Sequence, residues 1–125
     1  MQLNKLRQVA ARAGDLDATV AFYRDVLGAT LMGQFPNLAF FDFSGTRLML
    51  ENEAQTATLY FWVDDIDSAF KSLKDSGVTF VSDPHAIFRD DAGQFGPAGE
   101  SEVMAFFNDP AGNTLALASR RQDPD

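Results

Sequence analysis

The fold is decided by a stretch that the chain contains twice. The first copy, QVAARAGDLDATVAFYRDVLG, covers residues 8–28, and the second, TLYFWVDDIDSAFKSLKDSG, covers residues 58–77. In each copy an apolar run is followed by Asp15-Leu16-Asp17 or Asp65-Ile66-Asp67, and then by apolar residues at helical spacing. Because aspartate at the start of a helix accepts hydrogen bonds from the first free amides, each copy predicts a strand and a capped helix.

A second pair of similar segments extends the repeat toward the C-terminus. Residues 42–50, DFSGTRLML, align with residues 109–117, DPAGNTLAL. Short apolar runs between turn residues predict further strands at 29–33, 38–43, 46–51, 79–82, 103–107 and 113–119. We therefore expect one α+β domain over residues 1–125, with module one at about 5–52, module two at about 57–119, and an inserted loop rich in Gly, Asp and Pro at about 83–100. Two such modules should pack together and leave a cleft between them, where a ligand would bind.

The composition excludes several classes of function. The chain has no cysteine and one histidine, so a thiolate site, a disulfide or a His-rich metal centre cannot be built within it. A net charge of −8 argues against nucleic acid as a partner. This acidity serves either solubility or the attraction of a cationic ligand. No apolar run reaches the ~18 residues of a membrane span and no signal peptide is visible, which predicts no membrane partner and a cytoplasmic location.

Three motifs together resemble one superfamily. DLDATVAFYRDVLG (residues 15–28), VDDIDSAF (63–70) and FFNDPAGNTLAL (106–117) are weak signals singly, but their order and spacing are similar to those of the vicinal oxygen chelate superfamily. This group includes glyoxalase I, bleomycin-resistance proteins, extradiol dioxygenases and related lyases and isomerases. The resemblance covers roughly residues 6–119. It implies two βαβββ modules in a U-shaped mixed sheet around a central cleft, and a homodimer.

The resemblance also indicates where a metal would be held. Enzymes of this superfamily usually bind a divalent metal through His or Glu on the first and last strand of each module, and the matching positions here are Gln8, Met49, Thr58 and Ala116. None of these is an ionised or imidazole donor, so we predict that the family metal is missing and that no cofactor is bound. If the alignment is shifted by two residues, Glu51 replaces Met49 and one carboxylate remains, which is still too few donors for a site.

Strand alternation predicts a ligand-binding surface around the same positions. Side chains two residues apart share a face, so the candidate ligand-binding residues are Gln8, Arg12, Arg47, Met49, Glu51, Thr58, Tyr60, Trp62 and Ala116. Their chemistry suits a small apolar or aromatic molecule that carries one or two charged groups. In the alternative interpretation, Trp62 and Tyr60 fill a closed core, and Arg47 and Glu51 pair with each other at the surface. The parity of the Phe-rich strands is not decided by the sequence.

The sequence is compatible with two functions. The first is a metal-free protein that binds a small molecule, similar in architecture to the bleomycin-resistance members. The second is a lyase, isomerase or dioxygenase with a non-standard metal site, or with acid/base chemistry that uses His85 and Glu51. His85 is the natural candidate for a general base because histidine titrates near neutral pH, although a loop histidine in solvent has the same sequence pattern.

Overall fold

The structure is a computed structural model, and it describes residues 1–122. The contacts divide the chain into two compact units. Unit 1 consists of Met1–Ala57 and Asp109–Thr114, and unit 2 consists of Thr58–Asn108 and the chain from Leu115 onward. A short segment of the second sequence repeat is therefore built into the first unit.

Unit 1 contains one helical segment and a four-stranded mixed sheet. Its elements in chain order are β1 (Gln8–Arg12), α1 (Leu16–Ala21), the π-helical turn η1 (Phe22–Val26), β2 (Thr30–Gln34), β3 (Leu38–Phe43) and β4 (Thr46–Glu51). The strand order is β1-β4-β3-β2, with β1 parallel to β4 and the other neighbours antiparallel. We call this the first sheet. β3 and β4 are joined by the predicted turn, in which Ser44 and Gly45 both have positive φ (54° and 98°), as a two-residue hairpin requires.

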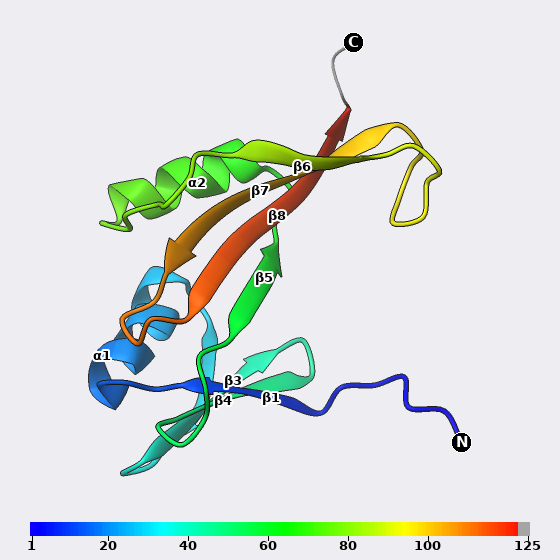
Figure 1. Cartoon of the computed structure of the whole chain (residues 1–125). Coiled ribbons are helices and arrows are strands. Elements are labelled where there is room, and N and C mark those ends of the chain that lie inside the picture. Colours follow the sequence, from blue (N-terminus) through cyan, green and yellow to red (C-terminus); the bar gives the residue numbers. More distant parts are fainter. Residues whose placement is uncertain (123–125) are drawn as a thin grey trace. The chain divides into compact units, whose positions relative to one another are not determined.

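Unit 2 repeats the same order of elements. They are β5 (Thr58–Trp62), α2 (Ile66–Asp75), β6 (His85–Asp90), β7 (Glu100–Asn108) and β8 (Thr114–Gln122). The second sheet has the strand order β5-β8-β7-β6. Figure 1 shows α2, in green, beside β7 of this sheet. Each unit is thus a βαβββ module, as the repeated sequence predicts.

Both helices begin where the paired acidic motifs predict. The Asp15 carboxylate accepts a hydrogen bond from the amide of Ala18 (3.2 Å), and the Asp65 carboxylate accepts one from the amide of Ser68 (3.1 Å). These bonds satisfy amides that have no partner inside the helix. The duplicated Asp-x-Asp motif is therefore a capping signal in both units.

Each sheet packs one face against its helix. In unit 1, Phe41, Leu48 and Leu50 are at most 1% exposed, and the rings of Phe41 and Tyr23 lie 5.5 Å apart. In unit 2, Phe107 is fully buried and its ring lies 5.1 Å from that of Phe80, which in turn contacts Phe70 of α2 at 4.5 Å. We call the opposite side of each sheet its open face.

The segment Asp109–Thr114 is held in unit 1 by a buried polar network. The Asp109 carboxylate accepts hydrogen bonds from the Tyr23 hydroxyl (2.8 Å), the Asn113 side-chain amide (2.8 Å) and the Asn113 and Ala111 backbone amides (2.9 Å each). The Asn113 side chain also donates to the carbonyl of Arg12 at 2.8 Å. Burial, together with the nearby Asp109 charge, raises the pKa of Tyr23, so its hydroxyl stays a donor. The Asp-Pro-x-Gly-Asn motif therefore has a structural role.

The structure differs from the sequence prediction in the segment 83–100. The predicted inserted loop contains the strand β6 (His85–Asp90), which pairs antiparallel with β7, and the longer loop is confined to residues 91–99. The strand expected at 79–82 is reduced to a single bridge between Phe80 and Phe107. Five of the six β6 residues are exposed, so the edge strand lacks the apolar alternation by which a strand is recognised. Within residues 1–122, no helix is long and apolar enough to cross a membrane.

Candidate functional site

The open face of the first sheet gathers five of the predicted ligand-binding side chains. β1 and β4 pair in a register that sets Gln8 beside Arg47, Ala10 beside Met49, and Arg12 beside Glu51. Because neighbours in register point to the same side, these side chains share a face, opposite the buried Leu48 and Leu50. β3 adds Phe40, which is paired with Met49.

Two hydrogen bonds fix the side chain of Gln8. Its Oε1 accepts from Nε of Arg47 at 3.1 Å, and its Nε2 donates to Sδ of Met49 at 3.8 Å. The reverse orientation of the amide would set its NH₂ group against the Arg47 N–H, two donors facing each other. The Gln8 oxygen is therefore turned toward a guanidinium group.

This arrangement does not fit the metal of the superfamily. Gln8 offers one neutral oxygen that already accepts from a cation, and Met49 offers a thioether that accepts from Gln8. A second cation at this place would meet the Arg47 charge and would find no ionised donor. In the part of the chain that the structure describes, no three His, Asp or Glu side chains lie close enough together to hold a metal ion.

Arg47 is held on two sides and open on the third. Its guanidinium carbon lies 5.5 Å from the centre of the Phe40 ring, and its Nε is bonded to Gln8. Among residues 1–122, neither terminal NH₂ group of Arg47 has a hydrogen-bond or ion-pair partner, and the alternative pairing of Arg47 with Glu51 is not formed. Arg12, at the other end of the face, only approaches the carbonyl of Asn52 at 3.5 Å.

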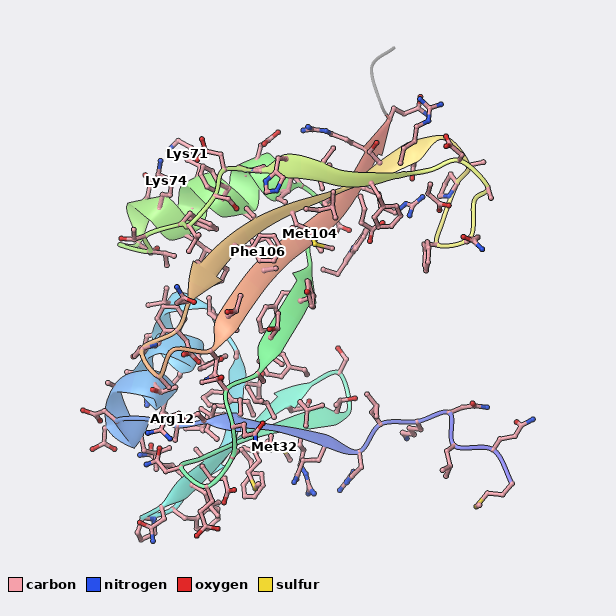
Figure 2. The ribbon with its side chains drawn as sticks, in the orientation of Figure 1. Arg12, Met32, Lys71, Lys74, Met104 and Phe106 are labelled. Atoms are coloured by element: carbon pink, nitrogen blue, oxygen red, sulfur yellow. The ribbon has the colours of Figure 1, made fainter. Side chains whose placement is uncertain are left out.

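The open face of the second sheet is aromatic. Tyr60 and Trp62 of β5 are 58% and 59% exposed, so the alternative in which they fill a closed core is wrong. The Tyr60 ring meets the edge of the Phe106 ring at 6.4 Å, which places Phe106 of β7 on the same face. Figure 2 shows Phe106 and Met104 on β7, while Lys71 and Lys74 extend from α2 away from the sheet. Thr58 is exposed and lies two residues before Tyr60 on β5, so its side chain points to the same face.

Ala116 lies on the strand next to β5. It is fully buried, and alternation along β8 places it on the same side as Arg120, whose guanidinium meets Glu102 on the open face. A methyl group contributes no donor or acceptor, so this position contributes shape only.

His85 lies at the start of β6 and is exposed. Its Nδ1 is 2.8 Å from the carbonyl oxygen of Asp83, so Nδ1 carries the proton in the neutral ring and Nε2 is left as an acceptor. Its ring lies 6.4 Å from that of Phe106, on the open face of the second sheet. Of the two candidate catalytic residues, His85 thus belongs to unit 2 and Glu51 to unit 1.

Sequence reasoning missed three members of these faces. Phe40 and Phe106 alternate with the buried Phe41 and Phe107, but consecutive Phe residues hide the parity of a strand. The third is Arg120, which donates to Glu100 (3.1 Å), Glu102 (2.8 Å) and Asp90 (2.9 Å). No local sequence motif predicts this cluster, because its members lie on three different strands.

The Arg120 cluster anchors the loop after β6. Burial alone would raise the pKa of Asp90, but the amides of Phe95 and Gln94 and the Arg120 guanidinium outweigh this and hold the pKa below its ordinary value. Arg120 also donates to the carbonyl of Pro97 at 3.1 Å. The Arg120 side chain is only 8% exposed, so its charge has a structural role.

Comparisons with known proteins agree with this architecture. Residues 5–117 match the Glyoxalase family, described as the Glyoxalase/Bleomycin resistance protein/Dioxygenase superfamily. Among curated proteins, none shows a significant sequence match to the chain.

Solved structures are similar along nearly the whole length. A lactoylglutathione lyase from Agrobacterium tumefaciens superposes with a TM-score of 0.78 at 21% identity, covering 95% of this chain and 96% of that one. A glyoxalase/bleomycin resistance protein/dioxygenase from Nocardioides gives 0.74 at 19% identity, with 100% and 89% covered. One of the same description from Alicyclobacillus acidocaldarius gives 0.68 at 24% identity, with 95% and 94% covered. At these identities the likeness shows the fold.

Proposed function

Because the chain belongs to the Glyoxalase/Bleomycin resistance protein/Dioxygenase superfamily, we propose that it binds a small apolar or aromatic molecule on the open faces of its sheets, without the metal that many relatives use. The observation that carries the proposal is the exposure of Tyr60 and Trp62, more than half exposed on adjacent positions of one face. Large aromatic side chains held in water on a rigid sheet favour a ligand that covers them.

The donor chemistry of both sheets supports the metal-free part of the proposal. At the positions matching the family's ligands, Gln8 faces Arg47, and Met49 accepts from Gln8. Thr58 offers a neutral hydroxyl, and Ala116 offers nothing. Recognition by shape and aromatic contact needs none of the ionised donors that a transition metal requires.

The proposal can be tested through the protein's own fluorescence. Trp62 is the only tryptophan, so its emission reports directly from the open face of the second sheet. We expect a panel of non-fluorescent, substituted benzenes to contain members that shift the emission of Trp62 and protect it from quenching by acrylamide. Failure of every member to do so at millimolar concentration would contradict the proposal.

A matched pair of variants identifies the surface to which the ligand binds. Tyr60→Ala removes a ring from the binding face and leaves the Trp62 reporter in place, and we expect at least ~tenfold weaker binding, in line with the loss of an aromatic contact. Phe95→Ala removes a ring of similar exposure, 69%, from the loop after β6 and should leave the affinity unchanged. Equal effects of the two variants would overturn the assignment of the face.

The geometry of His85 favours a second candidate, an acid/base catalyst of the same superfamily. The contact of Nδ1 with the Asp83 carbonyl leaves Nε2 as a base on the open face. If this function is correct, a ligand incubated with the protein in D₂O should exchange an activated C–H for C–D, and His85→Gln should abolish the exchange without weakening binding. Absence of exchange for every bound ligand would leave the binding function as the one supported.

Family membership also supports the proposal that the protein is a homodimer. Ile87, Phe88 and Phe95 are 43%, 40% and 69% exposed on β6 and the loop after it, and a second copy could cover them. Light scattering coupled to size-exclusion chromatography should then give twice the 13.7 kDa of one chain. A mass of one chain at all concentrations would reject the dimer.

A further inference from the structure

We propose that the ligand carries a carboxylate and that Arg47 of the first sheet binds it. This inference rests on the proposed function and adds to it the sign of the ligand's charge. It concerns the guanidinium of Arg47, which lies beside Gln8 and Met49, two of the positions that the sequence resemblance matches to metal ligands. The surrounding contacts determine what that guanidinium can still bind.

The contacts of Arg47 involve its Nε and the Phe40 ring. Nε donates to Gln8 at 3.1 Å, and the guanidinium carbon lies 5.5 Å from the centre of the Phe40 ring. The two terminal NH₂ groups form the remaining edge, and within residues 1–122 they have no acceptor. Two parallel N–H donors in one plane match the two oxygens of a carboxylate.

The side chain is also held in place before any ligand arrives. The bond to Gln8 and the contact with Phe40 restrict its rotation, and both partners are only partly exposed. A guanidinium that is already fixed loses little conformational entropy when it binds an anion. Phe40 and its neighbour Phe35, whose rings lie 6.3 Å apart, offer apolar surface beside the charge for the ring of an aromatic acid.

The acidity of the whole chain does not reverse this preference. The net charge is −8, but charges in solvent are screened over about 10 Å at 0.1 M salt, whereas a carboxylate on Arg47 would sit at hydrogen-bond distance. Two carboxylates share the open face, Asp42 and Glu51. Asp42 accepts from the Gly45 amide at 3.0 Å, and neither forms an ion pair with Arg47 in the described chain.

Arg120 shows what a satisfied arginine looks like in the same protein. It donates to three carboxylates and a carbonyl and is 8% exposed. Arg47, in contrast, has one neutral acceptor. The anion that would complete it is absent from its own unit, which points to a ligand as the source.

The experiment compares three molecules with one ring system. Calorimetric titration with 2-naphthoate, 2-naphthamide and 2-naphthylmethylammonium varies the charge from −1 to +1 at nearly constant shape. We expect 2-naphthoate to bind at least ~tenfold more tightly than the amide, the usual size of a charge-assisted hydrogen-bond effect, and the ammonium to bind most weakly.

Two variants then locate the charge effect. Arg47→Gln should lower the affinity for 2-naphthoate at least ~tenfold and leave that for 2-naphthamide unchanged. Arg24→Gln removes the same charge from an exposed position of unit 1, where Arg24 contacts Asp25, and should change neither affinity. A native circular dichroism spectrum and an unchanged affinity for 2-naphthamide show that Arg47→Gln is folded.

The outcomes separate this inference from the proposed function. If the three molecules bind equally well and Arg47→Gln changes nothing, the carboxylate inference is overturned and the aromatic site stands. If the ammonium binds best, the ligand is cationic and the inference is likewise overturned. If none of the three binds to the wild-type protein, both the inference and the proposed function fail.

Discussion

The open faces of the two sheets come from one repeated plan but carry different chemistry. On the first sheet, Gln8 accepts a hydrogen bond from Arg47 and donates one to Met49, and the terminal NH₂ groups of Arg47 have no acceptor within residues 1–122. On the second sheet, Tyr60 and Trp62 are exposed to solvent, and the guanidinium of Arg120 is paired with three carboxylates. Both units keep the βαβββ frame of the repeat, whereas their open faces differ: the first presents a guanidinium group and the second presents exposed aromatic rings.

We expect the largest losses of stability when phenylalanine is replaced on the packed face of a sheet rather than on its open face. Phe41 and Phe107 are fully buried against the helices, and their replacement by alanine should cost ~3–5 kcal/mol of unfolding free energy through lost burial and cavity formation. Phe40→Ala and Phe106→Ala remove the same ring from the open faces and should each cost clearly less. Urea denaturation measures all four variants. Equal losses within either pair would show that the sheet in question has no open face.

The two arginines should respond differently to loss of charge. Arg120→Gln removes the partner of a buried carboxylate cluster, so it should lower the stability more than Arg47→Gln does. Because Arg120 helps to depress the pKa of Asp90, its contribution is present at neutral pH and is lost as the pH falls below about 4 and Asp90 is protonated.

Urea titrations of wild type and Arg120→Gln at pH 7, 5 and 3 test whether the stability contributed by Arg120 falls with the pH. The difference in unfolding free energy should be largest at pH 7 and should narrow at pH 3. A difference that is constant over this range would mean that the Asp90–Arg120 pair does not stabilise the fold.

A smaller effect should show that the first face is internally bonded. Gln8→Ala removes the acceptor of Arg47 and the donor to Met49, and we expect a loss of ~0.5–1.5 kcal/mol, typical of a hydrogen-bonded side chain. Gln8→Glu keeps the acceptor for Arg47 and should retain most of this stability. Chemical denaturation compares the two, and equal losses would indicate that the Gln8–Arg47 bond is unimportant in solution.

The smallest change in stability should come from the second face. Trp62 is 59% exposed, and its indole N–H reaches only Asp64 at 3.3 Å. Trp62→Ala should therefore lower the unfolding free energy by less than about 1 kcal/mol while weakening ligand binding. A loss of ~3–5 kcal/mol would instead mean that Trp62 belongs to a core in solution.

Much of the frame could be predicted from the sequence, because its signals are local. The Asp15 and Asp65 caps and the Ser44-Gly45 turn depend on neighbouring residues, and β3 and β4 begin and end where the turn residues around them predict. The superfamily followed from the order of the motifs. The strand β6 was missed because an exposed edge strand has no apolar alternation.

The chemistry of the faces was harder to predict than the frame. Alternation could group Gln8 with Arg47 and Met49, but the orientation of the Gln8 amide and the open edge of Arg47 depend on side-chain geometry. The Arg120 cluster depends on three strands meeting, which no single segment encodes. The ligand roles of all these residues remain predictions.

The central claim is that aromatic surface and a guanidinium, without a metal ion, carry ligand binding. Its most direct test is calorimetric titration of 2-naphthoate into protein treated with EDTA, and into the same protein supplied with equimolar Zn²⁺, Ni²⁺ or Mn²⁺. We expect the same Kd in all four samples, since Gln8, Met49, Thr58 and Ala116 give a metal no ionised donor. Binding that disappears with EDTA and returns with one of the metals would contradict the claim.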